Sequence, residues 1–172
     1  MKNKHTIILI NFLFFFGCED KIEEETEEEI ITIDVITSNV NQEIFYYNFS
    51  NDSIDSTNWQ IMYHNLEIQG SGYSMPNFSF DSSKVSFAVD SINSFEDIVE
   101  PPPISTFKNT FSNLAYLGKY AVLSYDMSIH KVLTSELVYF IYDLETKQVF
   151  KIFFNEYSSG VVSFKYADLN YD

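Results

Sequence analysis

Hydrophobic and polar residues alternate along much of the chain after residue 30, and this two-residue period is typical of half-buried β-strands. The clearest example is 31–35, in which Ile and Val alternate with Thr32 and Asp34. Other segments are rich in β-branched and aromatic residues, which favour strands. Strands are predicted at 31–35, 44–49, 59–68, 78–80, 85–89, 120–125, 137–142, 149–154 and 161–166.

Turn-forming residues separate these segments. Residues 145–147 and 158–160 lie between long predicted strands near the end of the chain and predict two hairpins. A single helical turn is predicted at 95–99, before the three prolines 101–103, which a helix or strand interior does not accommodate. We therefore expect an all-β fold of mainly antiparallel sheet with at most one short helix, in a single domain over residues 31–172.

The first residues have the layout of an export signal. Lys2 and Lys4 precede an apolar run at 7–16, which closes on Gly17 and Cys18. The run is too short to span a bilayer as a helix. The Phe-Phe-Gly-Cys sequence resembles the lipobox of bacterial lipoproteins, in which the cysteine is lipidated and becomes the first mature residue. We predict a signal peptide at 1–17 and a lipid anchor on Cys18; the alternative is an ordinary signal peptide with an incidental cysteine.

An acidic stretch follows the cysteine. Residues 19–29 contain eight acidic residues and one lysine, and such a like-charge block repels itself and buries no apolar area. We predict that 18–30 is a disordered tether. The stretch also resembles the surface-export signal of Bacteroidetes-type lipoproteins, which implies an outer membrane lipoprotein on the cell surface; the alternative is a spacer without a sorting role.

The charge composition of the chain narrows the classes of molecule that it can bind. The formal net charge is −15 and the chain contains no arginine, which argues against nucleic acid, because phosphate binding requires a cationic surface. The same charge argues against electrostatic adhesion to anionic lipid, so membrane attachment falls to the anchor on Cys18. The phosphate-binding, dinucleotide-binding and nucleophile motifs of common enzymes are absent from the sequence. We expect a binding protein and not an enzyme.

Several segments together carry a resemblance to one family. One runs from Trp59 through His64 to Gly70, and it resembles the Trp-Asp-hydrophobic-x-aromatic-His-Arg segment of the HmuY family. The other segments with this resemblance are 44–50, 94–101, 137–142, 148–152 and 161–166. The resemblance covers about residues 44–166 and implies an all-β lipoprotein of the outer membrane. It also implies haem binding between paired His or paired Met ligands, and transfer of the haem to an outer-membrane transporter.

Candidate haem ligands follow from this resemblance. Imidazole and thioether groups both ligate haem iron, and Met127 and His130 lie near the place of the family's second ligand, with spacing slightly in favour of Met127. Met75 follows a glycine-rich stretch and is a further candidate. Tyr120 and Tyr116 are also candidates, because tyrosinate ligates ferric haem.

Lysines are the available partners for the haem propionates, because arginine is absent. Lys131 and Lys119 flank the predicted site, and Lys108 is a third cation. The structural alternatives are a core thioether for Met127 and a loop histidine for His130. The functional alternative is a surface lipoprotein that binds no haem and has a structural, adhesive or glycan-binding role.

Overall fold

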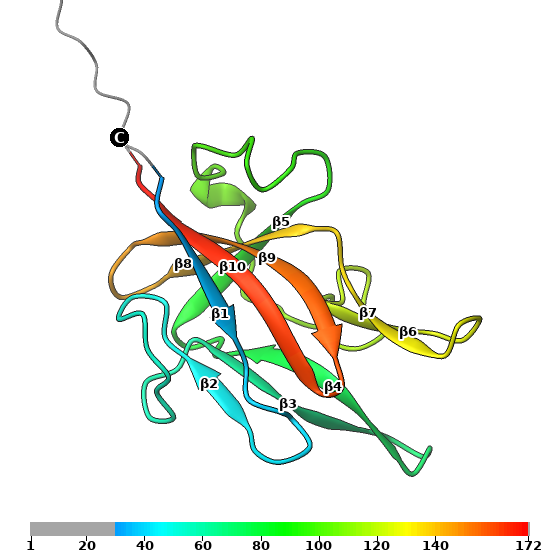
Figure 1. The fold of residues 1–172 in the computed structure, drawn as a ribbon. Coiled ribbons are helices and arrows are strands. Elements are labelled where there is room, and N and C mark those ends of the chain that lie inside the picture. The colour runs from blue at the N-terminus through cyan, green and yellow to red at the C-terminus, as the bar shows by residue number, and fades with distance from the viewer. Residues whose placement is uncertain (1–29, 172) are drawn as a thin grey trace, which may run out of the picture.

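The computed structural model describes residues 30–171, which form two packed β-sheets and a projecting hairpin (Figure 1). The predicted signal peptide at 1–17, Cys18 and nearly all of the predicted tether lie outside these residues. The strands are β1 (Thr32–Ile36), β2 (Phe45–Tyr47), β3 (Ile61–Ile68), β4 (Tyr73–Phe80), β5 (Val85–Asp90), β6 (Leu123–Asp126), β7 (Lys131–Thr134), β8 (Val138–Asp143), β9 (Val149–Ser158) and β10 (Val161–Leu169). The all-β prediction is confirmed.

The larger sheet has the strand order β1-β10-β9-β8-β5, and all neighbours are antiparallel. Both predicted hairpins are present. In the β8–β9 turn the Asp143 carboxylate accepts backbone hydrogen bonds from Glu145 at 2.7 Å and Thr146 at 2.9 Å. In the β9–β10 turn Ser159 and Gly160 both have positive φ, the backbone geometry that a two-residue hairpin favours.

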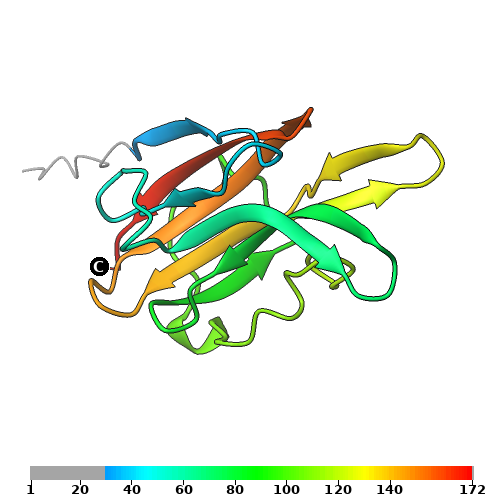
Figure 2. The same ribbon diagram turned by 90° about the horizontal axis from the view of Figure 1, so that it is seen from below.

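The smaller sheet has the order β2-β3-β4 and lies against one face of the larger sheet (Figures 1 and 2). Inward side chains from both sheets form an aromatic core, which is the product of the alternation seen in the sequence. Phe154 lies at its centre with an exposed fraction of 0%, and its ring packs against those of Phe78, Tyr139 and Phe164. Because both sheets contribute large rings, this core links them into one unit.

A second, smaller core lies on the other face of the larger sheet. There a segment that we call the cover segment (residues 91–107) packs Phe95, Ile98 and Phe107 against outward side chains of β8, β9 and β10. Lys151 of β9 is buried beneath this segment, and its Nζ donates to the carbonyl oxygens of Phe95 and Ile98, both at 2.7 Å. The larger sheet is therefore covered on both faces, which explains why the β8 and β9 sequences are almost continuously apolar.

Two local predictions differ from the structure, and one strand was missed. Residues 95–99 form a turn and not a helix; within residues 30–171 the one short helix is η1 (Ile104–Thr106), a 3-10 turn directly after the prolines. The predicted strand at 78–80 begins earlier, at Tyr73, because β4 is an edge strand and tolerates Pro76. Strand β7 was not predicted, since its four residues are too short for a clear alternation.

Candidate functional site

Two hairpins project from the same side of the sandwich, away from the end where β1 begins and β10 ends (Figures 1 and 2). One is the β3–β4 hairpin, which contains Met75. The other is the β6–β7 hairpin, which contains Met127, His130 and Lys131. The structure thus places three of the five predicted haem-site residues together on one projecting element.

The β6–β7 turn has a defined local structure. The Asp126 carboxylate accepts hydrogen bonds from the Ser128 backbone N–H at 2.8 Å and the Ser128 hydroxyl at 2.6 Å. These contacts favour the ionised form and hold the pKa of Asp126 below its usual range, the hydroxyl bond having the larger effect. His130 closes the turn in the left-handed region, with φ of 52°, a conformation that few non-glycine residues adopt. The turn is therefore fixed by its own side chains.

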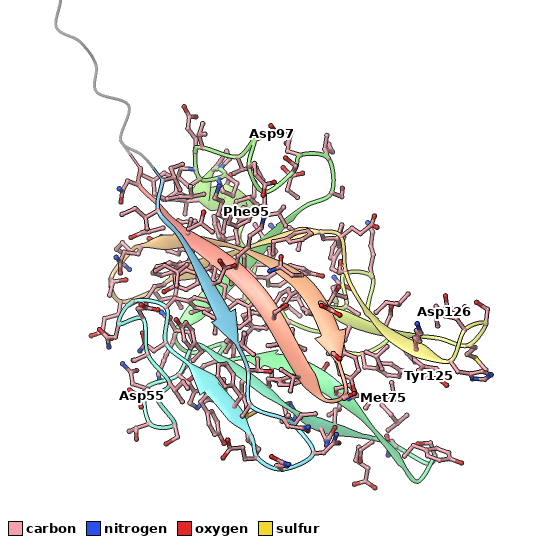
Figure 3. The ribbon with its side chains drawn as sticks, viewed as in Figure 1. Asp55, Met75, Phe95, Asp97, Tyr125 and Asp126 are labelled. Carbon is pink, nitrogen blue, oxygen red and sulfur yellow. The ribbon has the colours of Figure 1, made fainter. Side chains whose placement is uncertain are left out.

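His130 is oriented by a neighbouring strand residue, Tyr125, which lies on the projecting β6–β7 hairpin (Figure 3). The His130 Nδ1 lies 3.0 Å from the Tyr125 hydroxyl, and the two rings are tilted against each other. Within the described residues the other ring nitrogen, Nε2, has no hydrogen-bond partner. A metal-binding histidine characteristically has one ring nitrogen held by a neighbour and the other free. Binding of iron at Nε2 requires the tautomer in which Nδ1–H donates to the Tyr125 oxygen.

The β6–β7 hairpin also exposes apolar surface. Met127 has an exposed fraction of 78%, and the exposed large hydrophobic residues of the hairpin also include Tyr125, Ile129 and Leu133. The structural alternative, in which the Met127 thioether packs in the core, is therefore wrong. Tyr125 pairs with Val132 and Leu133 pairs with Ser124, so Tyr125 and Leu133 lie on opposite faces of the hairpin. The apolar surface near His130 is therefore formed by Tyr125 and by the turn residues Met127 and Ile129.

The remaining predicted haem-site residues lie elsewhere. Met75 is half-buried on β4 opposite Leu66, on the face of the hairpin away from the Tyr63–Phe78 pair. Tyr120 packs against the main core, with the ammonium of Lys119 4.8 Å from its ring centroid. The structure does not show Met75 or Tyr120 in contact with the β6–β7 turn. His64 lies on β3, with Nε2 2.8 Å from the Ser79 hydroxyl oxygen.

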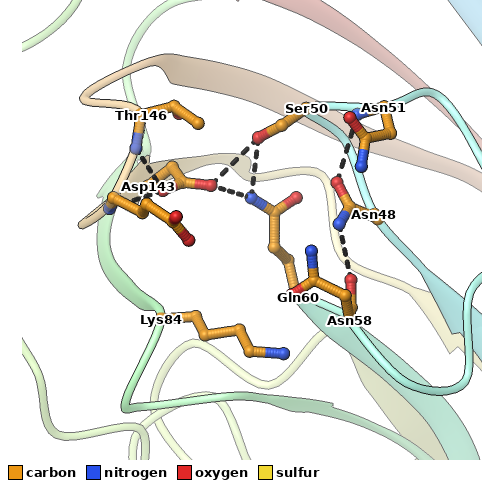
Figure 4. A pocket seen from close by; sticks show the side chains of 9 residues that line it. Asn48, Ser50, Asn51, Asn58, Gln60, Lys84, Asp143 and Thr146 are labelled. Atoms are coloured by element: carbon orange, nitrogen blue, oxygen red, sulfur yellow. Dashed lines mark hydrogen bonds between the residues drawn. The ribbon is translucent and has the colours of Figure 1, made fainter.

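A separate polar pocket of about 200 Å³ lies between the loop that follows β2 and the β8–β9 turn (Figure 4). Its base is formed by buried side chains of Asn48, Gln60 and Asp143. The remaining lining residues are Ser50, Asn51, Asn58, Lys84, Glu145 and Thr146. The lining contains no aromatic side chain, so the groups that it offers to a ligand are hydrogen-bonding and charged groups.

Hydrogen bonds at the base of the polar pocket connect the two sheets. The Gln60 amide donates to the Asp143 carboxylate and, at 3.0 Å, to the Ser50 hydroxyl, while its oxygen accepts from the Phe49 N–H at 2.6 Å. The Ser50 hydroxyl donates to Asp143 at 2.9 Å. Because these base groups satisfy one another, a ligand would meet the rim residues Lys84 and Glu145. The Lys84 ammonium also pairs with Asp81 at 3.6 Å and donates to the Trp59 carbonyl oxygen at 3.3 Å.

A third polar cluster stabilises the loop beside this pocket. The hydroxyls of Tyr47 and Tyr166 both donate to one oxygen of Asp52, the latter at 2.8 Å. These two bonds lower the pKa of Asp52, the bond from Tyr47 having the larger effect. Burial, and to a lesser extent the bond to Asp52, raises the pKa of Tyr166 to about 12. The cluster holds the loop against the core.

Sequence reasoning missed the polar pocket and the buried Lys151. Gln60 and Asp143 are 83 positions apart, and nothing local in either segment indicates that they meet. Lys151 did carry a signal, because a lysine inside an apolar strand that is covered on both faces must find buried acceptors. That signal indicates a need for partners without naming them.

Comparisons with known proteins add no family assignment. No protein-family model matches the chain, and no curated protein matches it. Among residues 30–171 there is no group of three or more His, Cys, Asp or Glu side chains placed to hold a metal ion. The same residues contain no helix long and apolar enough to cross a membrane.

Proposed function

We propose that this chain is a lipid-anchored surface protein of the HmuY type, which binds haem or a related tetrapyrrole and passes it to an outer-membrane transporter. The role is capture and transfer, without catalysis. The observation that carries the proposal is the β6–β7 turn, where His130 is oriented by Tyr125 and stands in solvent beside Met127. The leader, Cys18 and the acidic stretch supply the argument for surface anchoring.

The site fits haem in three respects. His130 Nε2 and the Met127 thioether are both recognised iron ligands. Tyr125, beside His130, and the exposed turn residues Met127 and Ile129 offer apolar surface to the porphyrin, and Lys131, next to His130, offers a cation to a propionate. Because Met127 and His130 share one turn, this hairpin would supply one of them to the iron of a bound haem, and Met75 or a group of the receiving transporter would supply any second ligand.

The decisive experiment is a hemin titration of residues 19–172, followed by visible absorption in the oxidised and reduced states. We expect a saturable, sharp Soret band that is lost or shifted in His130→Ala or Met127→Ala, and altered in Tyr125→Phe. His64→Ala is the matched control, because His64 is the other histidine of the described residues and is engaged with Ser79. A broad, unsaturable spectrum unchanged by the hairpin substitutions would refute haem capture.

The polar pocket supports a second candidate function, the binding of a glycan unit. Its volume suits one sugar ring, and amide, hydroxyl, ammonium and carboxylate groups surround it. Glycan-array retention that is lost in Lys84→Ala and Glu145→Ala, without hemin binding, would favour this function. Rim residues are chosen because loss of Gln60 or Asp143 would disturb the network that joins the sheets.

A further inference from the structure

The end of the sandwich opposite the projecting hairpins exposes large apolar side chains. We call this surface the apolar end and define it by Ile31, Val99, Ile104 and Tyr171. Their exposed fractions run from 40% for Tyr171 to 76% for Ile31. The later part of the cover segment, the start of β1 and the end of β10 lie at this end of the molecule, where the Tyr171 side chain reaches Pro102 (Figures 1 and 2).

The apolar side chains of the cover segment stand on a firmly held backbone. Phe95 and Ile98 are buried against the larger sheet, and Lys151 binds both of their carbonyl oxygens. The Tyr171 hydroxyl donates to the carbonyl oxygen of Pro102 at 2.7 Å, which ties the segment to the end of the chain. With the neighbouring positions fixed inward, Val99 and Ile104 are left facing solvent.

The position of the apolar end relative to the predicted lipid anchor indicates which kind of partner this surface contacts. The described residues begin at Ile30, beside the apolar end, and Cys18 precedes Ile30 by only twelve positions. Twelve residues span at most about 40 Å, so an anchor on Cys18 would keep this end within that distance of the bilayer. Such tethering gives a high effective concentration, at which even a weak surface contact is occupied.

We propose that the apolar end rests on the lipid surface, with Val99 and Ile104 in the bilayer interface, so that the β6–β7 hairpin points away from the membrane. This inference rests on the lipid anchor of the proposed function, but not on haem binding. The cover segment also contains Glu96, Asp97 and Glu100 and no cation. The contact is therefore apolar and favours zwitterionic lipid, since anionic headgroups would repel these carboxylates.

The test uses the lipidated full chain in phosphatidylcholine vesicles. An Ile104→Cys variant is labelled with an environment-sensitive fluorophore, and quenching by spin-labelled lipid is measured. The matched control is Gln69→Cys in the turn of the β3–β4 hairpin, an exposed site on a projecting element. We expect a blue-shifted, lipid-quenched label at position 104, a water-exposed label at position 69, and weaker quenching at position 104 when phosphatidylglycerol is added.

The outcomes separate the two proposals. Equal, water-like emission at positions 104 and 69 on vesicle-bound protein would overturn the membrane contact. A blue shift at position 104 without quenching by spin-labelled lipid would also overturn it, because the label would then be covered by protein, such as a second copy. A second label on Cys18, with no vesicle binding, would show that the anchor itself is absent.

Discussion

The buried ammonium of Lys151 gives the sharpest test of how the cover segment is held. Its exposed fraction is 3%, and Nζ donates two hydrogen bonds of 2.7 Å while lying 4.2 Å from the centre of the Phe95 ring. The substitution Lys151→Met keeps the length and the apolar stem of the side chain. It removes both donors, and it leaves the carbonyl oxygens of Phe95 and Ile98 buried without them.

The expected loss follows from two opposing terms. Hydrogen bonds from a charged donor contribute about 1.5–3 kcal/mol each, and an unsatisfied buried carbonyl costs a similar amount. Removal of the ammonium also relieves the cost of burying a charge, which offsets part of this loss. We expect Lys151→Met to reduce the free energy of unfolding by about 2–4 kcal/mol.

Urea unfolding followed by the fluorescence of Trp59, the single tryptophan, measures this change. Lys165→Met is the matched control: Lys165 also lies over the Phe95 ring, but it pairs with the exposed Glu96. A surface pair of this kind contributes about 0–1 kcal/mol. Equal effects of the two substitutions would refute the reasoning, as would unchanged hydrogen exchange at residues 95–99 in Lys151→Met.

The pH dependence of the free energy of unfolding provides a second test of the role of Lys151. Burial lowers the pKa of Lys151 below its ordinary value, so the folded domain releases this proton at lower pH than the unfolded chain does. Since the unfolded state then binds more protons, the stability contributed by Lys151 rises with pH up to the ordinary lysine pKa. We expect the stability difference between the wild type and Lys151→Met to grow with pH in that window.

Three further predictions concern the core and two carboxylates. Phe154→Ala should lower the free energy of unfolding by about 3–5 kcal/mol in a urea titration, whereas Ile129→Ala on the exposed hairpin should change it by less than about 0.5 kcal/mol. Because hydrogen bonds lower the pKa of Asp52, its contribution is present above the ordinary aspartate pKa and is lost as pH falls through the lowered value. The stability difference between the wild type and Tyr47→Phe should therefore shrink between pH 5 and pH 2, and a constant difference would contradict this. Burial raises the pKa of Asp168, whose Oδ1 has no hydrogen-bond partner in the described structure; Asp168→Asn should thus be at least as stable as the wild type at pH 7 by thermal unfolding.

The strands were predictable where a single physical cause fixed the pattern. Segments such as 31–35 and 161–166 alternate because one face is buried, and the structure places strands β1 and β10 there. The cover segment was not predictable in form, because residues 95–99 take their conformation from carbonyl contacts with Lys151, more than fifty positions away. The polar pocket was not predictable for the same reason, since its base joins residues that are far apart in the sequence.

Exposure makes the proposed haem site experimentally separable from the fold. Met127 contributes little burial, and His130 is held by one contact to Tyr125 on the same hairpin, so substitutions there should leave the packed core intact. Lys151 is the opposite case, because its side chain supports the cover segment and lies far along the sheet from the hairpin tip. A hemin spectrum that changes in His130→Ala while the urea midpoint stays constant therefore reports on ligation. If the spectrum changed only in variants that also lose stability, the haem would be responding to unfolding, and the β6–β7 turn would not be its site.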